Sequence, residues 1–473
     1  MFLVCTYNPI SLSSTMLCQD RPWFVCFLSA GLLVIIWSFR LFDVRDAFSI
    51  LVYDEPRQQH EETVFLAQAM NVEFPAPIDF QPIQEVCAQT QFRPGLLFTC
   101  EGQHGGIGMV RNQILKCIRY AIHAGAAVVV PSMALRNASD ITDIETTTEV
   151  PLDYMFDREH FVTRLSTGCP GMRIYGKAED FPSYAQRAGE PLSIVGDQFE
   201  PDHPPEGLRY PQQWRQSFDS WLDDQLVTPR PEAPVHIKLD QSFLEYPVLA
   251  DGKAFADEFG KILSFRNHTR ELAAQVLFEL KRRFKLPIDP RKAINPDAFY
   301  GCHLRLEKDA IDAWQPDEWR FSRMEEQFEE QFRYIERTGL SLVYVASGDQ
   351  EVVDIFTERL AARIKLNATS ETRNVTVVTK HDLLQGGDRR QLDSLTFDQQ
   401  ALVDFMVLFK SSAFMGVAHS SFPWNIALRR HELSKHPQYG NEGSDLLNDE
   451  YSVIMGMAAD YPHVDPFVSG LWP

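Results

Sequence analysis

The residues best suited to chemistry are a histidine and an arginine, His303 and Arg305, at the end of a predicted strand. Alternation along a strand directs these two side chains to the same side. The planar guanidinium of arginine offers two parallel charge-assisted hydrogen bonds, which suits a diphosphate. Asp309 follows four residues beyond the arginine. An Arg–Asp pair on the surface, which contributes almost nothing to stability, is the plainer alternative.

A glycine-rich turn, Gly105-Gly106-Ile107-Gly108, follows a short apolar segment at 96–100. Glycines let a backbone approach a ligand closely, and the helix predicted after the turn offers its N-terminal amides to an anion. The turn matches neither the dinucleotide-binding fingerprint nor the P-loop. A turn that needs glycine only for its backbone conformation explains the segment equally well.

A third candidate site is Ser420-Ser421-Phe422, between a predicted strand and the closing helix. The serines and the first amides of the helix could bind an anion, and the phenylalanine ring could lie against a flat base. The serines could equally be simple helix caps. Asp404 is a charged residue on an otherwise apolar helix and could accept hydrogen bonds from guanine N–H groups. A lone aspartate on a helix is more often solvated.

Alternating strands and helices must position these motifs. A strand, a turn, a helix and a second strand follow one another over 96–131, which is the size of a βαβ unit. The last third predicts strands at 298–306, 341–347, 374–379 and 413–417, and helices at 324–338, 351–364, 398–410 and 423–430. We therefore expect an α/β protein with two Rossmann-like domains facing a cleft, and ligands at the carboxyl ends of the strands. The middle, 140–235, is predicted as irregular insertions or long loops.

The charge of the chain restricts its partners. Lys and Arg number 45 against 65 Asp and Glu, a formal net charge of −20. A surface of this kind repels phosphate backbones, so we expect no nucleic-acid partner. A single small anion remains possible, because one arginine and a few helix-start amides can bind it.

An uncharged apolar segment, 22–39, lies between Arg21 and Arg40. As a helix it would span about 27 Å, close to the hydrocarbon core of a bilayer. Trp23 and Trp37 stand near its two ends, where interfacial aromatic residues belong. We expect an uncleaved signal anchor that holds the protein in a membrane; a cleaved signal peptide and a buried core helix are the alternatives.

Sequons and cysteines bear on the compartment. Asn-x-Ser/Thr occurs at Asn137, Asn267, Asn367 and Asn374, which favours a lumenal body. We therefore expect a single-pass type II protein of the Golgi or endoplasmic reticulum membrane. Five cysteines follow the predicted anchor, so at most two disulfides form there and one thiol stays free. No zinc-type Cys/His spacing occurs, and no metal is expected.

Taken together, the motifs resemble the GDP-fucose protein O-fucosyltransferase family. The resemblance runs in pieces over about 96–435. It rests on the glycine turn, His303-Leu304-Arg305 with Asp309, Asp404, Ser420-Ser421-Phe422 with Arg429 and Arg430, and 156–161, which is similar to the family's FDxxHF segment.

The resemblance implies a GT-B fold whose C-terminal lobe holds GDP-fucose as donor, with no metal or other cofactor. It implies inverting transfer of fucose to a hydroxyl of a protein or glycan. By this analogy Arg305 binds the β-phosphate and stabilises the leaving GDP. The remaining candidates for binding the nucleotide sugar are His303, Asp309, Asp404, Ser420, Ser421, Phe422, the turn residues Gly105, Gly106, Ile107 and Gly108, and Arg111.

The chain departs from the family directly after the glycine turn. Met109 and Val110 stand where the family often has an asparagine near the acceptor hydroxyl and the sugar. Methionine can neither accept nor orient a proton. Glu101 or His104 could be the general base if it lies within about 3 Å of the acceptor oxygen, although Glu101 could equally be a plain surface carboxylate. A non-catalytic carbohydrate- or protein-binding descendant, or a transferase with another donor, therefore remains open.

These expectations divide the chain into four parts. Residues 1–40 contain the anchor at 22–39, and 41–94 form a stem. Residues 95–295 form an N-terminal Rossmann-like domain with irregular insertions, and 296–473 form a C-terminal Rossmann-like domain that binds the nucleotide sugar.

Overall fold

The computed structural model describes residues 59–70, 73–74, 76–137, 148–366, 374–435, 447–456 and 464–473. The chain divides into two compact units, Met1–Thr63 and Val64–Pro473, and the description below concerns the second. The predicted anchor at 22–39 and the sequon at Asn367 lie outside the described residues. Within the described ranges, no helix combines the length and apolar character needed to cross a membrane.

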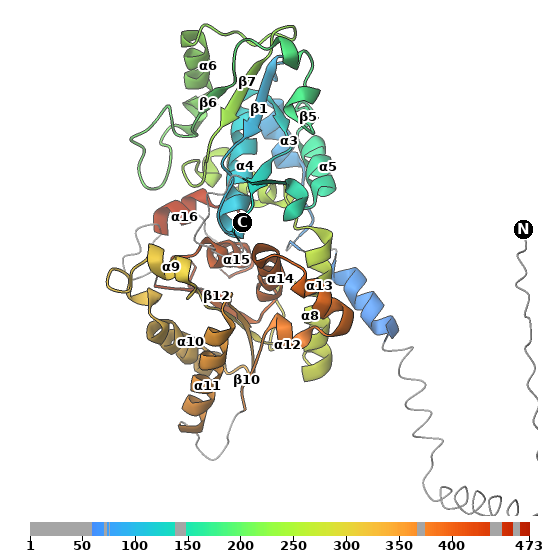
Figure 1. Cartoon of the computed structure of the whole chain (residues 1–473), viewed down its shortest axis with the longest axis vertical. Helices are drawn as coiled ribbons and strands as arrows, with labels where there is room; N and C mark the ends of the chain where they lie inside the picture. Colours follow the sequence, from blue (N-terminus) through green and yellow to red (C-terminus); the bar gives the residue numbers. More distant parts are fainter. Residues whose placement is uncertain are drawn as a thin grey trace, which may run out of the picture. The chain divides into compact units, whose positions relative to one another are not determined.

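The first lobe is built on a parallel sheet of five strands in the order β5-β2-β1-β7-β6. The strands are β1 (Leu96–Cys100), β2 (Ala127–Val129), β5 (Ile174–Tyr175), β6 (Leu192–Ile194) and β7 (Val235–Leu239). Helices α3 (Gln81–Ala88), α4 (Ile107–Ala124), α5 (Arg158–Gly168) and α6 (Trp214–Asp224) surround this sheet (Figure 1). The sheet face that carries Leu97 and Ala127 packs against a small apolar cluster around Phe181. This cluster lies next to two short 3₁₀ turns at Ala178–Asp180 and Tyr184–Gln186.

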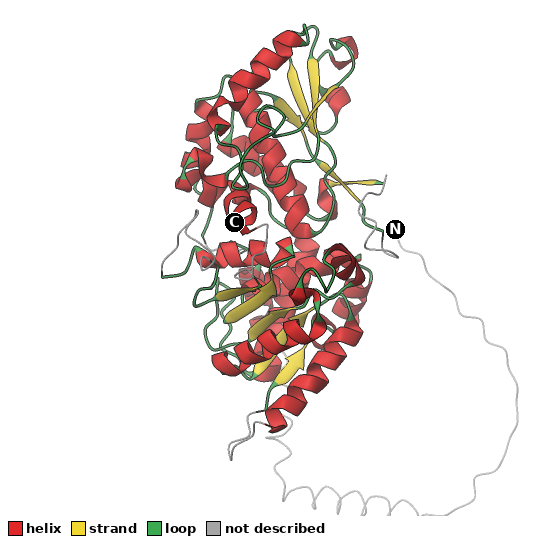
Figure 2. Cartoon of the chain, turned by 90° about the vertical axis from the view of Figure 1, so that its left-hand side faces the viewer, coloured by secondary structure: helices red, strands yellow, loops and turns green. Residues whose placement is uncertain are grey.

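The second lobe repeats this plan with a parallel sheet in the order β10-β9-β8-β11-β12. Its strands are β8 (Tyr300–His303), β9 (Leu342–Ala346), β10 (Thr376–Val378), β11 (Ala413–Val417) and β12 (Ser452–Met455). Its helices include α9 (Lys308–Ala313), α10 (Met324–Thr338), α11 (Gln350–Leu366), α12 (Lys380–Leu383), α13 (Gly386–Asp393), α14 (Phe397–Phe409) and α15 (Ser421–His431). Figure 2 shows the two groups of strands with helices packed around them. The predicted α/β class with parallel sheets is confirmed.

Several segments pack outside the domain to which the sequence assigns them. Helix α8 (Asn267–Phe284), predicted within the first domain, packs along α14 of the second lobe (Figure 1). Trp472, which follows α16 (Val464–Gly470), belongs to the core that includes the first lobe. Phe65, Ile83 and Cys87, from the predicted stem, are also buried in that core. Globular packing therefore begins well before residue 95.

The middle of the chain has more regular structure than the sequence indicated. The range 140–235, predicted as irregular, contains α5, α6, β5, β6 and β4 (Glu149–Pro151), which pairs antiparallel with β3 (Ser132–Ala134). In α6, Trp214, Phe218 and Leu222 are buried at a spacing of four. This spacing is a helix signal that the sequence already held.

Two disulfides stabilise the first lobe. Cys87–Cys169 joins α3 to the end of α5, and Cys100–Cys117 joins the end of β1 to α4. Cys302 in β8 is the free cysteine of the described residues and is buried. These bonds match the expected limit of two disulfides and one free thiol after the anchor.

Candidate active site

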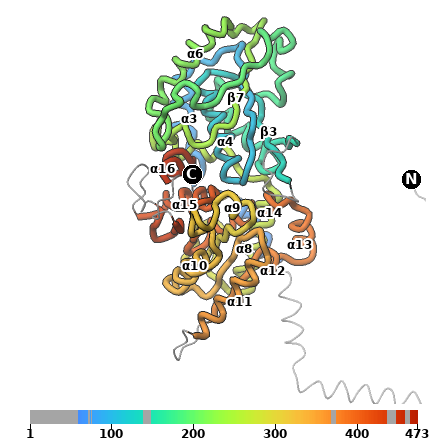
Figure 3. Tube along the Cα trace, turned by 60° about the vertical axis from the view of Figure 1, so that its left-hand side comes forward, coloured from blue at the N-terminus to red at the C-terminus, as the bar shows by residue number. Residues whose placement is uncertain are grey.

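A pocket of about 520 Å³ lies between the two lobes of the second unit. Figure 3 shows α4 of the first lobe close to α15 of the second. The pocket forms where the carboxyl ends of β8 and β11 face the first turn of α4. These two strands are neighbours where the strand order of the second sheet reverses, which is the usual ligand crevice of an open parallel sheet. The volume lies in the range of small-molecule sites.

Three helix N-termini line this pocket. Gly106 is the N-cap of α4, Ser420 is the N-cap of α15, and Phe397 and Asp398 form the first turn of α14. Each N-terminus carries a partial positive charge and backbone amides without a helical partner. Their convergence favours an anionic ligand.

The three glycines of the turn differ in how a side chain at each position would fit. Gly105 has a φ of +101°, a conformation that L side chains rarely adopt. A Cβ at Gly106 would meet nothing within 4 Å. A Cβ at Gly108 would lie 2.7 Å from the backbone oxygen of Ser421, so this glycine lets α4 pack closely against α15.

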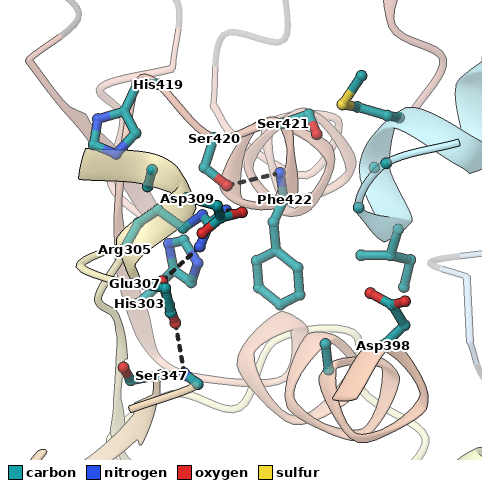
Figure 4. A pocket seen from close by; sticks show the side chains of 18 of the residues that line it. His303, Arg305, Glu307, Asp309, Ser347, Asp398, His419, Ser420, Ser421 and Phe422 are labelled. Atoms are coloured by element: carbon teal, nitrogen blue, oxygen red, sulfur yellow. Dashed lines mark hydrogen bonds and ion pairs between the residues drawn. The ribbon is translucent and has the colours of Figure 1, made fainter. Parts of the chain in front are cut away.

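Arg305 is held at the pocket by two carboxylates, as Figure 4 shows. Its guanidinium donates to Glu307 at 2.7 Å and to Asp309, and Glu307 accepts a further bond from the amide of Gly348 at 2.6 Å. Burial lowers the pKa of Arg305, but the two carboxylates outweigh burial and leave the pKa above its ordinary value. The guanidinium is therefore a fixed positive charge.

A second guanidinium, Arg136, reaches the pocket from the first lobe. It follows β3 and forms ion pairs of 3.1 Å with Asp309 and 3.1 Å with Asp398. Burial raises the pKa of Asp398 despite the neighbouring Arg136. Sequence reasoning missed Arg136 and Asp398, because no local motif surrounds either residue.

Aromatic rings form one wall of the pocket. Phe422 stacks on His303 with ring centroids 4.8 Å apart, and its edge meets Phe405 at 5.4 Å. Figure 4 shows the Phe422 ring between His303 and Asp398. One face of the ring is thus already covered by the imidazole. Burial lowers the pKa of His303 to about 3 and that of His419 to about 4, so both imidazoles are neutral near pH 7.

Asp404 lines the pocket but is not solvated. One carboxylate oxygen accepts from the Tyr344 hydroxyl at 2.7 Å, and the other pairs with Lys380 at 2.6 Å. The side chains of Lys380 and Asp404 are 7% and 6% exposed, so this is a buried ion pair. The pair fixes the direction in which Asp404 presents its remaining lone pairs.

Several buried polar atoms of the pocket have no hydrogen-bond partner among the described residues. They are His303 Nδ1, Asp309 Oδ1 and His419 Nε2. A buried polar atom without a hydrogen bond costs about 1–3 kcal/mol. A polar ligand in the pocket would offer partners to these atoms, whereas an apolar one would not.

Comparison with known proteins identifies the chain's relatives. A sequence profile described as GDP-fucose protein O-fucosyltransferase matches residues 96–433. The chain belongs to this family. Its members are fucose-transferring glycosyltransferases, and the resemblance seen in the motifs is confirmed.

Solved structures of other fucosyltransferases are similar to the chain at low identity. POFUT1 in complex with GDP is 15% identical with a TM-score of 0.44, over 78% of this chain and all of that one. A mutant of Arabidopsis thaliana FUT1 in complex with GDP is 11% identical with a TM-score of 0.33, over 74% and 71%. NodZ alpha-1,6-fucosyltransferase co-crystallised with GDP is 12% identical with a TM-score of 0.34, over 70% and 91%. No curated protein matches the chain.

The pocket gathers most of the residues that the family resemblance assigned to the nucleotide sugar. Those that line it are Gly105, Gly106, Ile107, Gly108, His303, Arg305, Asp309, Asp404, Ser420, Ser421 and Phe422. Met109, where the family often has an asparagine, lines it as well. Ser420 also caps α15 by accepting from the amide of Phe422 at 3.4 Å, so the capping and lining roles coexist.

Arg111 does not line the pocket, contrary to expectation. It is almost fully buried on a different face of α4 and donates to the backbone oxygens of Trp472 and Pro473, each at 2.7 Å. A third bond reaches the oxygen of Gly260 at 3.0 Å. Arg111 thus anchors the final residues of the sequence rather than a ligand.

Glu101 and His104 also lie outside the pocket lining. The carboxylate of Glu101 accepts from the Thr99 hydroxyl at 2.8 Å and lies 3.8 Å from Lys238. The backbone amide of His104 donates to Gln113 at 3.0 Å. Their role as a general base stays a prediction.

The described residues contain no cluster of three or more His, Cys, Asp or Glu side chains that could hold a metal ion. Of the sequons, Asn267 and Asn374 are exposed and Asn137 is half-buried.

Proposed function

We propose that the protein transfers fucose from GDP-fucose to a hydroxyl of a protein or glycan acceptor, with inversion at the sugar and without a metal. The observation that carries the proposal is Arg305, held by two carboxylates in a pocket lined by three helix N-termini. A diphosphate is the part of GDP-fucose that such a site suits. Family membership supports fucose as the transferred sugar.

In the proposed reaction, negative charge develops on the diphosphate next to Arg305. The acceptor oxygen forms a bond to the anomeric carbon while the bond from this carbon to the β-phosphate oxygen breaks. The electron pair of the broken bond leaves with GDP, and the acceptor's proton passes to a base. Negative charge therefore grows on the diphosphate, where a guanidinium fixed by Glu307 and Asp309 stabilises it without reorganising.

The nucleotide would lie along the wall formed by the second lobe. His303 Nδ1 and His419 Nε2 are buried, have no hydrogen-bond partner within the described part of the chain, and could hydrogen-bond the donor. Asp404, oriented by Lys380 and Tyr344, is the proposed acceptor for guanine N–H groups. The amides at the start of α15 would contact the phosphates.

A donor screen tests this proposal. The full-length protein is incubated with GDP-fucose, GDP-mannose and a UDP-sugar, and release of the nucleoside diphosphate is measured. We expect release from GDP-fucose above that from the other donors. Equal release from all three, or from the UDP-sugar alone, would contradict the donor assignment.

A non-catalytic binding protein with the same fold is the second candidate. It is favoured by Met109, which lines the pocket where the family often has an asparagine, while Glu101 and His104 are not among the lining residues. Calorimetry with GDP separates the candidates. Tight binding supports the enzyme, and no binding at millimolar GDP supports the binding protein.

We also propose a type II protein of the Golgi or endoplasmic reticulum membrane, anchored through 22–39 with a lumenal body. Two disulfides support an oxidising compartment, and the four sequons support lumenal exposure. Treatment of the cell-expressed protein with an N-glycosidase should lower its apparent mass. No mass change, together with release from membranes by alkaline carbonate, would contradict this placement.

A further inference from the structure

Among the described residues, Arg136 is the cation that the first lobe contributes to the pocket lining. It lies two residues beyond β3, and its side chain is 7% exposed. Its two carboxylate partners, Asp309 and Asp398, both belong to the second lobe. The ion pairs of Arg136 therefore join the two lobes at the pocket.

Arg136 and Arg305 converge on a single acceptor atom. The Nη2 atom of Arg136 lies 3.1 Å from Asp309 Oδ2, and Nη2 of Arg305 donates to the same oxygen. Two guanidiniums that can donate to one carboxylate oxygen can also donate to one phosphate oxygen, since the distances and angles required are similar.

Charge also requires more than Arg305. Arg305 with its partners Glu307 and Asp309 carries one positive and two negative charges, a sum of −1. Arg305 alone therefore does not make this cluster positive. Arg136 and its second partner Asp398 add one charge of each sign and leave the sum at −1, so the groups that attract an anion are the two neighbouring guanidiniums and the helix N-termini around the pocket.

We propose that Arg136 is a second residue that binds the donor's diphosphate, donating together with Arg305 to the β-phosphate. This inference rests on the proposed function, because it assumes a nucleoside diphosphate sugar as donor. It adds a binding residue from the first lobe to a nucleotide site otherwise built by the second. Donor binding then strengthens the contact between the lobes at the pocket.

Comparison of GDP with GMP tests the inference, since GMP lacks the β-phosphate. Dissociation constants for both nucleotides are measured on the full-length wild type, Arg136→Met and Arg136→Lys. In Arg136→Met we expect the GDP constant to rise about 10- to 100-fold, the size of a lost charge-assisted hydrogen bond. The GMP constant should change by less than about threefold on the same reasoning. Arg136→Lys should fall between, because lysine keeps the charge but loses the planar fork.

Arg270→Met is the matched control. Arg270 is also largely buried, pairs with Asp157 at 3.2 Å, and does not line the pocket. We expect both of its dissociation constants to match the wild type. If Arg136→Met does not fold, the double variant Arg136→Met with Asp398→Asn replaces it, because removing both charges avoids an unpaired buried carboxylate.

Two results would overturn the inference while leaving the proposed function intact. One is an equal loss of GDP and GMP affinity in Arg136→Met, which indicates a purely structural ion pair. The other is unchanged GDP affinity in that variant. A wild type that binds no GDP would overturn the proposed function and this inference together.

Discussion

The two lobes share one architecture but use the carboxyl ends of their strands differently. In the second lobe, side chains beyond β8 and β11 point into a pocket shared with three helix N-termini. In the first lobe, Glu101 beyond β1 and Lys238 of β7 lie near each other and line a separate groove of about 810 Å³. Its buried His236 is already paired with Thr99 at 2.9 Å and Tyr184 at 3.0 Å.

A charged residue at a strand end is therefore not by itself a functional signal. In the first-lobe groove His236 has protein partners on both ring nitrogens, whereas the second-lobe pocket leaves atoms such as His303 Nδ1 without one. The converging helix N-termini therefore distinguish the pocket from the groove, because the described lining of the groove also holds a buried atom without a hydrogen-bond partner, Arg187 Nε.

The largest expected effect concerns the buried ion pair below the pocket. Lys380→Met leaves the Asp404 carboxylate buried without its cation and should cost about 3–5 kcal/mol of unfolding free energy. Lys238→Met is the matched change in the first lobe. Its side chain is 40% exposed, so loss of the pair with Glu101 should cost less than about 1 kcal/mol. Denaturant unfolding measures the free energy of unfolding of both variants. Equal losses of this free energy would contradict the difference between the buried pair and the exposed pair.

The contact between the lobes gives the next effect. Gly108→Ala places a Cβ 2.7 Å from the backbone oxygen of Ser421, so α4 and α15 must move apart. We expect a loss of about 1–3 kcal/mol of unfolding free energy. Gly106→Ala, whose Cβ meets nothing within 4 Å, should cost less than about 1 kcal/mol. Equal stability of the two variants in thermal unfolding would show that α4 and α15 are not closely packed.

The loss of stability at acid pH should be similar in both lobes, because it depends on the burial of their histidines and not on function. Burial lowers the pKa of His303 to about 3 and of His236 to about 4, below the value of about 6.5 in an unfolded chain. Between these values the unfolded state binds more protons, so stability falls as pH falls from about 6.5. Replacing either histidine with glutamine should remove about 1–2 kcal/mol of the stability difference between pH 7 and pH 5. Urea midpoints at the two pH values measure it, and an unchanged difference in both variants would contradict buried neutral histidines.

The smallest effect is expected at the first-lobe strand end itself. Glu101→Gln should change GDP-fucose turnover by less than about threefold, whereas removing a general base costs about 10²–10⁴-fold. The same result is expected for His104→Gln. A hundredfold loss of turnover in either variant would support that residue as the general base. It would also contradict the difference between the strand ends of the two lobes.

Elements with strong local patterns could be predicted closely from the sequence. Helix α10 matches its predicted range 324–338, and strands β1 and β11 match 96–100 and 413–417. Continuous apolar runs and regular amphipathic spacing are read within one segment, so they need no knowledge of the rest of the fold. Short strands such as β5 and β6 escaped prediction because two or three residues carry no periodicity.

The candidate site could be predicted only as far as its motifs reach. His303 ends β8, Arg305 follows β8 and Ser420 follows β11, and all three line the pocket. Arg136 pairs with Asp309 and Asp398, which lie 173 and 262 positions further along the chain. No local sequence pattern predicts contacts over such separations. Arg111 was misplaced for the opposite reason: it lies near the glycine turn in sequence, but the helix turns it to another face.

The most direct test of the central claim is GDP-fucose turnover by Arg305→Ala beside the wild type and Lys238→Ala. If Arg305 stabilises the leaving diphosphate, its loss should lower turnover about 10²- to 10³-fold, as removal of a preorganised donor does elsewhere. Lys238→Ala, in the first-lobe groove, should retain turnover close to wild type. Near wild-type turnover in Arg305→Ala would contradict the account.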